Sequence, residues 1–313
     1  MGKLALCFVL LCITLALAGC DRSGLTPVDS TSTPSKLPRF EVVAAENFWG
    51  SLAAQLAGSR ADVHSIIVNP STDPHSYQPT ARDARLVAGA NIAIVNGAGY
   101  DDWAKRLLGA SPASGRVTLD VGALLELGPG ANPHRWYFPG DVRTVLDAIA
   151  ADYERLDPAD AAYFARRRQM LRRSGFARYE QLLREIRGRY AGVTVGYSES
   201  LFQGLGEALG LKLKTPYSFA KAITEGTDVT AQDRQTVDAQ AQRREIAVWV
   251  FNSQNVTPDV RRVNEIARER HIPIATITET LSPASVGFQR WQESQLEGLL
   301  RALRQAQTPV SRR

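Results

Sequence analysis

The fold of this chain is decided by one stretch, residues 157–190, which reads DPADAAYFARRRQMLRRSGFARYEQLLREIRGRY. Asp157 can cap a helix, Pro158 is tolerated at the first helical position, and Ser174 with Gly175 weakens the middle. Apolar residues recur at three- and four-residue steps at Phe176, Tyr179, Leu183, Ile186 and Tyr190. Because similar patterns lie on both sides, we interpret this stretch as one long helix joining two globular halves. A surface helix of a single domain is the alternative.

Each half alternates short apolar runs with helical segments. The runs that predict buried strands are residues 40–45, 63–68, 92–95, 193–197, 246–251 and 274–277. The predicted helices are residues 48–57, 82–88, 201–209, 230–242, 258–268 and 289–307. Gly58 and Gly89 follow the first two helices, where a helix C-terminus favours glycine. This alternation is typical of right-handed βαβ units and therefore of parallel sheets.

The predicted fold class is thus α/β, with two parallel-sheet lobes joined by one long α-helix. We expect an N-terminal α/β lobe at residues 39–156, a linker helix at residues 157–190 and a C-terminal α/β lobe at residues 191–307. About 270 residues are enough for two modest domains, each with its own core.

The N-terminal residues predict export. Lys3, an apolar run and small residues before Cys20 form the pattern of a secretory signal peptide at residues 1–19. Leu17-Ala18-Gly19-Cys20 resembles the lipobox of bacterial lipoproteins, in which the cysteine is lipidated. An ordinary signal peptide with an incidental cysteine is the weaker interpretation, because Cys20 would be the only mature cysteine. Residues 20–38 are rich in Ser, Thr and Pro and predict a flexible tether, so we expect an extracytoplasmic protein anchored to the cell membrane by lipid.

Charge and composition exclude some partners. The net charge of +5 comes mostly from scattered arginines, many of them on the long helix. A basic surface can attract nucleic acid, but an exported protein rarely meets it and no aromatic-basic motif is present. We interpret the arginines as solvent-exposed surface residues, and expect a monomer with no nucleic-acid partner.

The chain has four histidines, and two of them are candidate ligands. His64 lies inside a strand pattern and His271 precedes a strand, so both are interpreted as structural or surface residues. His75 and His134 each follow a proline in a loop. Proline restricts how the loop presents the imidazole, which makes both side chains plausible ligands, although a Pro-His dipeptide alone is weak support.

Two carboxylates follow strands of the second half. Glu199 comes after the strand that ends at Tyr197, and Glu279 after the strand that ends at Ile277. In α/β sheets, ligands bind beyond the carboxyl ends of the strands. Either glutamate alone is better explained by the dipole of a helix N-terminus. Together with His75 and His134 they predict an N2O2 site for a divalent transition metal between the lobes.

Several motifs then resemble the metal-binding solute receptors of bacterial ABC transporters, the cluster (A-I) that delivers manganese, zinc or iron. The stretches that carry this resemblance are Asp73-Pro74-His75, Val-Asn-Gly-Ala-Gly-Tyr-Asp-Asp-Trp at residues 95–103, Asn132-Pro133-His134-Arg135-Trp136, Ser198-Glu199-Ser200 and Thr278-Glu279-Thr280. The resemblance covers nearly the whole exported part and implies two lobes joined by one long helix. It also implies His75, His134, Glu199 and Glu279 as metal ligands. Asn132 stands where the family usually has an acid, and Glu279 where it usually has the shorter aspartate.

The resemblance also bears on which metal binds. Receptors for zinc often have a histidine at the third ligand position and a His-rich loop, and this chain has Glu199 and no such loop. Two carboxylates suit Mn²⁺, which prefers oxygen-rich coordination, although the general affinity order favours zinc. Mn²⁺ is therefore the favoured metal and Zn²⁺ the next.

We accordingly predict a solute-binding lipoprotein, not an enzyme, that delivers the metal to the ABC permease and its ATPase. An exported metallohydrolase with the same site is the alternative from another class, but it would need an open coordination position and a general base. A metal-stabilised adhesin, and a siderophore or cobalamin receptor without the four polar ligands, are the further alternatives.

Overall fold

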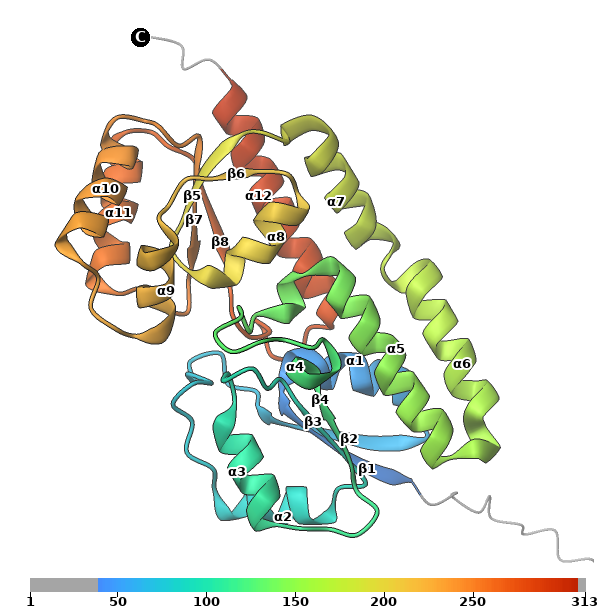
Figure 1. The fold of residues 1–313 in the computed structure, drawn as a ribbon. Coiled ribbons are helices and arrows are strands. Elements are labelled where there is room, and N and C mark those ends of the chain that lie inside the picture. The colour runs from blue at the N-terminus through green and yellow to red at the C-terminus, as the bar shows by residue number, and fades with distance from the viewer. Residues whose placement is uncertain (1–38, 309–313) are drawn as a thin grey trace, which may run out of the picture. The chain divides into compact units, whose positions relative to one another are not determined.

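The computed structural model describes residues 39–308, which belong to one compact unit, Pro38–Arg313. The predicted signal peptide, the predicted lipidation site Cys20 and the predicted tether lie outside the described residues. Two four-stranded parallel sheets, each accompanied by helices, make up the fold (Figure 1). The predicted α/β class with two parallel sheets is confirmed.

The first sheet has the strand order β2-β1-β3-β4. Its strands are β1 (Phe40–Glu46), β2 (Ala61–Ile67), β3 (Ile92–Val95) and β4 (Val117–Asp120). The helices between and after them are α1 (Asn47–Ala57), α2 (Ala81–Gly89), α3 (Asp102–Ala110) and α4 (Val121–Leu124). β4 and α3 were not predicted. Gly58 caps α1 with a left-handed φ of 55°, as expected, whereas Gly89 is the last residue of α2 and Ala90 its cap.

The second sheet repeats this plan with the order β6-β5-β7-β8. Its strands are β5 (Thr194–Tyr197), β6 (Lys212–Leu213), β7 (Val248–Asn252) and β8 (Ile274–Ile277). Its helical segments are η4 (Ser200–Phe202), α8 (Gln203–Ala208), α9 (Tyr217–Glu225), α10 (Ala231–Gln242) and α11 (Pro258–Glu269). In each sheet the strand that comes first in the sequence lies second in the spatial order. The loops after the two central strands therefore lie at the same edge of the sheet. We call each sheet with its helices a lobe.

The connection between the lobes begins with η1 (Arg135–Tyr137) and α5 (Pro139–Leu156), a helix of 18 residues that was not predicted. The predicted joining helix follows as η2 (Pro158–Asp160), α6 (Ala161–Met170), the π-helical turn η3 (Leu171–Gly175) and α7 (Ala177–Tyr190). Asp157 caps its start by accepting from the Asp160 amide at 3.3 Å. The joining helix is not one uninterrupted α-helix, because it contains the π-helical turn at Ser174 and Gly175. There the Ser174 hydroxyl donates to the Met170 carbonyl at 2.8 Å.

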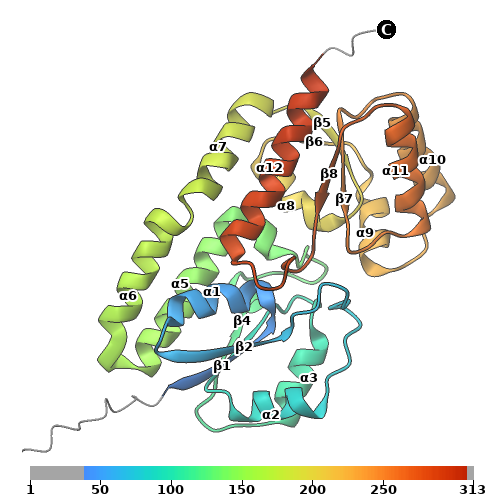
Figure 2. The ribbon, with the colours of Figure 1, turned by 180° about the vertical axis from the view of Figure 1, so that it is seen from behind.

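The last helix, α12 (Phe288–Gln307), runs beside α7 and packs on the second sheet (Figure 2). One hydrophobic cluster continues from Val42 in β1 through the joining helix to Val248 in β7 and Leu296 in α12. This shared core ties the lobes together and limits how far they can separate. Among residues 39–308, none of the helices combines the length and apolar character needed to cross a membrane.

Candidate metal centre

The loop after β2 presents His75. Asp73 shapes this loop, because one carboxylate oxygen accepts from the His75 amide at 2.9 Å and the other from the Ser76 hydroxyl at 2.7 Å. The indole of Trp103 donates to the Pro74 carbonyl at 3.0 Å and fastens the loop to α3. The His75 side chain remains 27% exposed, so it lies at the rim of the site.

The second histidine is held from behind. His134 is fully buried, and the side-chain oxygen of Asn132 lies 3.0 Å from its amide and 2.7 Å from its Nδ1. An amide oxygen can only accept, so it fixes the proton on Nδ1 and leaves the lone pair on Nε2. Within the described part of the chain, that Nε2 atom has no hydrogen-bond partner. A buried, correctly oriented imidazole nitrogen of this kind is a ready metal ligand.

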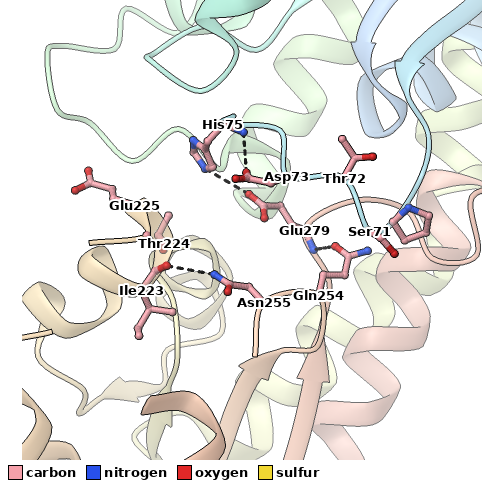
Figure 3. A pocket seen from close by; sticks show the side chains of 12 residues that line it. Ser71, Thr72, Asp73, His75, Ile223, Thr224, Glu225, Gln254, Asn255 and Glu279 are labelled. Atoms are coloured by element: carbon pink, nitrogen blue, oxygen red, sulfur yellow. Dashed lines mark hydrogen bonds and ion pairs between the residues drawn. The ribbon is translucent and has the colours of Figure 1, made fainter. Parts of the chain in front are cut away.

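Glu279 brings the two histidines together. Its Oε1 lies 3.6 Å from Nε2 of His75 and 3.6 Å from Nε2 of His134. The hydroxyl of Tyr100 donates to the same oxygen at 3.1 Å, and Gln254 accepts from the Glu279 amide at 2.8 Å. Figure 3 shows His75 pointing at Glu279 across the space between the two loops. One ligand atom from each of the three residues lies within 4.8 Å of the other two, which is the spacing of a metal cluster.

Glu199 lies outside this group of three but close to it. It follows β5, is 2% exposed, and receives a hydrogen bond from the Asn252 amide group at 3.3 Å. In the part of the chain that the structure describes, its second carboxylate oxygen has no partner. The structure therefore clusters three of the four predicted ligands, and it places the fourth as a buried carboxyl with a free oxygen.

Burial and the charges of neighbouring groups shift the pKa values of all four predicted ligands. Burial lowers the pKa of His134, which favours the neutral imidazole. For His75 burial acts in the same direction, but the hydrogen bond and charge of Glu279 outweigh it and raise the pKa. The Glu279 pKa is lowered because the two imidazoles outweigh its burial. Burial and the Glu279 charge raise the Glu199 pKa well above its ordinary value. A divalent cation would compensate this concentration of carboxyl groups.

A cavity of about 210 Å³ opens beside the cluster. Its walls come from both lobes. Residues 70–73 and 75 line it from the first lobe, and residues 223–226 at the end of α9 and residues 254–255 line it from the second, with Glu279 between them (Figure 3). This position, between the lobes and beyond the carboxyl ends of the strands, is where an α/β fold binds a ligand.

The other two histidines lie elsewhere, as expected. His64 is on β2, where its Nε2 lies 3.3 Å from a carboxylate oxygen of Glu41 and both side chains are exposed. His271 is exposed at the entrance to β8, with a left-handed φ of 52°. Neither belongs to the metal cluster.

Several residues around the site were not predicted from the sequence. Asn252 ends β7 and holds Glu199, Gln254 follows the strand and holds Glu279, and Tyr100 holds Glu279 from the first lobe. Polar residues at the carboxyl end of β7 were the available signal, because this strand is central in its sheet. Glu46, at the end of β1, is completely buried, and burial together with the nearby Asp101 charge raises its pKa well above the ordinary value.

A histidine-carboxylate cluster between two parallel α/β lobes that a long helix joins defines a bilobal receptor for a metal ion. The profile of the family described as "Zinc-uptake complex component A periplasmic" matches residues 42–302. The chain belongs to this family of periplasmic metal-binding solute receptors, and the resemblance seen in the motifs is confirmed.

Individual relatives differ in the metal that their names give. The chain is 29% identical over 167 residues to the manganese-binding lipoprotein MntA of Halalkalibacterium halodurans, covering 52% of this chain and 53% of that protein. It is 25% identical over 252 residues to the iron-binding protein YfeA of Yersinia pestis, covering 78% of this chain and 71% of that one. The first two curated relatives are matched over 53% and 58% of their length, slightly more than half.

Solved structures show the same fold. The Mn-bound periplasmic metal-binding protein of Candidatus Liberibacter asiaticus superposes with a TM-score of 0.72 at 16% identity, covering 85% of this chain and all of that chain. The Mn²⁺ complex of FpvC from Pseudomonas aeruginosa gives 0.69 at 20% identity, covering 86% of this chain and all of that chain. A laminin-binding adhesin from Streptococcus agalactiae gives 0.69 at 17% identity, covering 84% of this chain and 99% of that one. At these identities the likeness concerns the fold alone.

Proposed function

We propose that this protein is the extracytoplasmic receptor of an ABC importer, which captures a divalent transition metal and delivers it to the membrane permease and its ATPase. The observation that supports this most directly is the convergence of His75, His134 and Glu279 within 4.8 Å. The cluster forms from loops of both lobes, so a bound ion would bridge them. Family membership supports the same function and the permease as partner.

We further propose Glu199 as the fourth ligand. Its buried free oxygen and its raised pKa are both explained if a cation normally occupies the space between Glu199 and Glu279. Two imidazoles and two carboxylates would then surround the ion. Mn²⁺ is favoured by the oxygen-rich half of this set, and Zn²⁺ is the next candidate. The names of the relatives support manganese and also admit iron.

The mode of attachment completes the proposal. Cys20 would carry the lipid anchor, and residues 20–38 would tether the receptor to the membrane near its permease. The lipobox-like sequence and the lipoprotein name of a relative support this assignment.

The experiment that tests the function is a metal titration of residues 21–313, stripped of metal, with Mn²⁺, Zn²⁺ and Fe²⁺ in separate runs. We expect one-to-one binding that raises the thermal stability and that is lost in His134→Ala. His64→Ala is the matched control and should bind like the unaltered chain. The absence of stoichiometric binding for all three metals would contradict the proposal.

A further inference from the structure

Asn132 uses its two side-chain atoms on different lobes. Its oxygen faces the amide and Nδ1 of His134, in the loop that leads from the first lobe. Its amide nitrogen donates to the Ser200 carbonyl at 2.7 Å and to Oε1 of Gln203 at 3.2 Å, both in the second lobe. One side chain therefore connects the ligand loop of His134 to the segment that follows Glu199.

The surroundings of this contact are closely packed. Phe138, at the start of α5, which packs on the first lobe, lies against Gly204 of α8, so close that a Cβ on Gly204 would be 2.3 Å from the ring. The guanidinium of Arg135 covers the Phe138 ring at 3.7 Å from its centroid. The lobes thus meet along a seam formed by residues 132–138 and 200–204, at the rear of the metal site. The hydrogen bonds within residues 39–308 include none between the His75 loop and the second lobe. There, Nε2 of His75 lies 3.6 Å from Oε1 of Glu279.

We propose that Asn132 is an interlobe strut that sets the position of His134 relative to Glu199. This role deepens the proposed function, on which it rests, because Asn132 acts through two proposed ligands without touching the ion. It requires an amide, since the same side chain must accept on one side and donate on the other. An aspartate could still accept from His134, but its second oxygen would face the Ser200 carbonyl oxygen and repel it.

As a consequence, the side of the site with His134 and Glu199 is fixed, and the side with His75 is adjustable. The strut holds His134 and the Glu199 segment in register before any metal arrives, so this half of the ligand set is preorganised. Removal of the strut should loosen the seam in the metal-free protein and weaken the binding of the metal. Because outer hydrogen bonds to metal ligands typically contribute 10- to 100-fold in affinity, we expect a loss of roughly that size.

The decisive measurement is the distance between the lobes in metal-free protein, obtained with spin labels on Arg106→Cys in α3 and Glu265→Cys in α11. Both positions are exposed, and residues 21–313 contain no native cysteine that would compete for the label. We expect Asn132→Asp to shift and broaden the distance distribution. Asn132→Ala, which adds no charge, should broaden it as well and serves if the aspartate variant fails to fold.

The matched control is Gln240→Glu. Gln240 also donates an amide hydrogen to a carbonyl, that of Lys214 at 3.1 Å, but both residues belong to the second lobe. This variant introduces the same charge and loses the same kind of bond, and it should leave the interlobe distance unchanged. An unchanged distance in both Asn132 variants would overturn the proposal, even if the metal bound more weakly, because Asn132 would then act on His134 alone. Since this measurement needs no metal, its failure is distinguishable from a failure of the proposed transport function.

Discussion

The hydroxyl of Tyr100 donates a hydrogen bond to Oε1 of Glu279 at 3.1 Å, although the two residues are 179 positions apart in the chain. This bond crosses from the first lobe to the second. It also ends on the carboxylate oxygen that faces both histidines. Tyr100 therefore aims the central carboxylate of the metal centre.

The Tyr100→Phe variant should bind metal about tenfold more weakly, because Glu279 loses the donor that orients it. Titration calorimetry with Mn²⁺ measures the change. Tyr77→Phe is the matched control, since Tyr77 donates to Asp83 at 2.8 Å outside the metal cluster, and its affinity should be unaltered. Equal affinities for the two variants would show that Tyr100 does not position the ligand.

At a pH below the raised pKa values of His75 and Glu199, metal binding should release protons, because both groups must be deprotonated to ligate. As the pH falls through each raised pKa, the protonated fraction grows and the affinity should fall by about tenfold per pH unit for each proton displaced. Calorimetry in buffers of different ionisation enthalpy counts these protons. Glu199→Gln should release one fewer, and an identical count would argue against Glu199 as a ligand.

The Glu279→Gln substitution should lower the pKa of His75 in the metal-free protein. The carboxylate is what raises that pKa against the opposing effect of burial, so its neutralisation leaves burial dominant. NMR titration of the imidazole resonances measures the shift. Glu225→Gln is the control, since the charge of Glu225 raises the His75 pKa less than the charge of Glu279 does. A His75 pKa that stays high in Glu279→Gln would show that another group supplies the charge.

The Gly204→Ala substitution should destabilise the fold by about 1–3 kcal/mol, because the new methyl group would overlap the Phe138 ring at the seam between the lobes. Urea unfolding measures this change in the free energy of unfolding. Gly188→Ala, in α7, should instead stabilise the protein by about 0.5–1 kcal/mol, because its new Cβ would meet no described atom within 4 Å outside the nearby backbone of its own helix. If the two substitutions had the same sign, the seam would not be tightly packed.

The local elements were largely predictable because their signals lie within a few residues. Asp157 and Pro158 marked the start of the joining helix, and the apolar run at residues 92–95 became β3 with the same bounds. β4 and α5 were not predicted, because β4 has one buried residue in four and α5 begins at Pro139, three residues after the motif that was assigned to ligand binding. From the sequence, Ser174 and Gly175 predicted only a weak point in the helix. Neither residue dictates that π-helical hydrogen bonds replace the α-helical ones there.

By itself, the sequence determined the α/β class, the joining helix and the four candidate ligands, because proline loops and strand ends place side chains by local geometry. Only the tertiary structure decided which of those ligands converge. His75, His134 and Glu279 form a cluster, while Glu199 is buried near Glu279 with one oxygen that has no hydrogen-bond partner among residues 39–308. The bonds that align them, from Asn132 and Tyr100, span the two lobes. Such contacts depend on how two sheets pack across a shared core, and no local pattern in the chain records that packing.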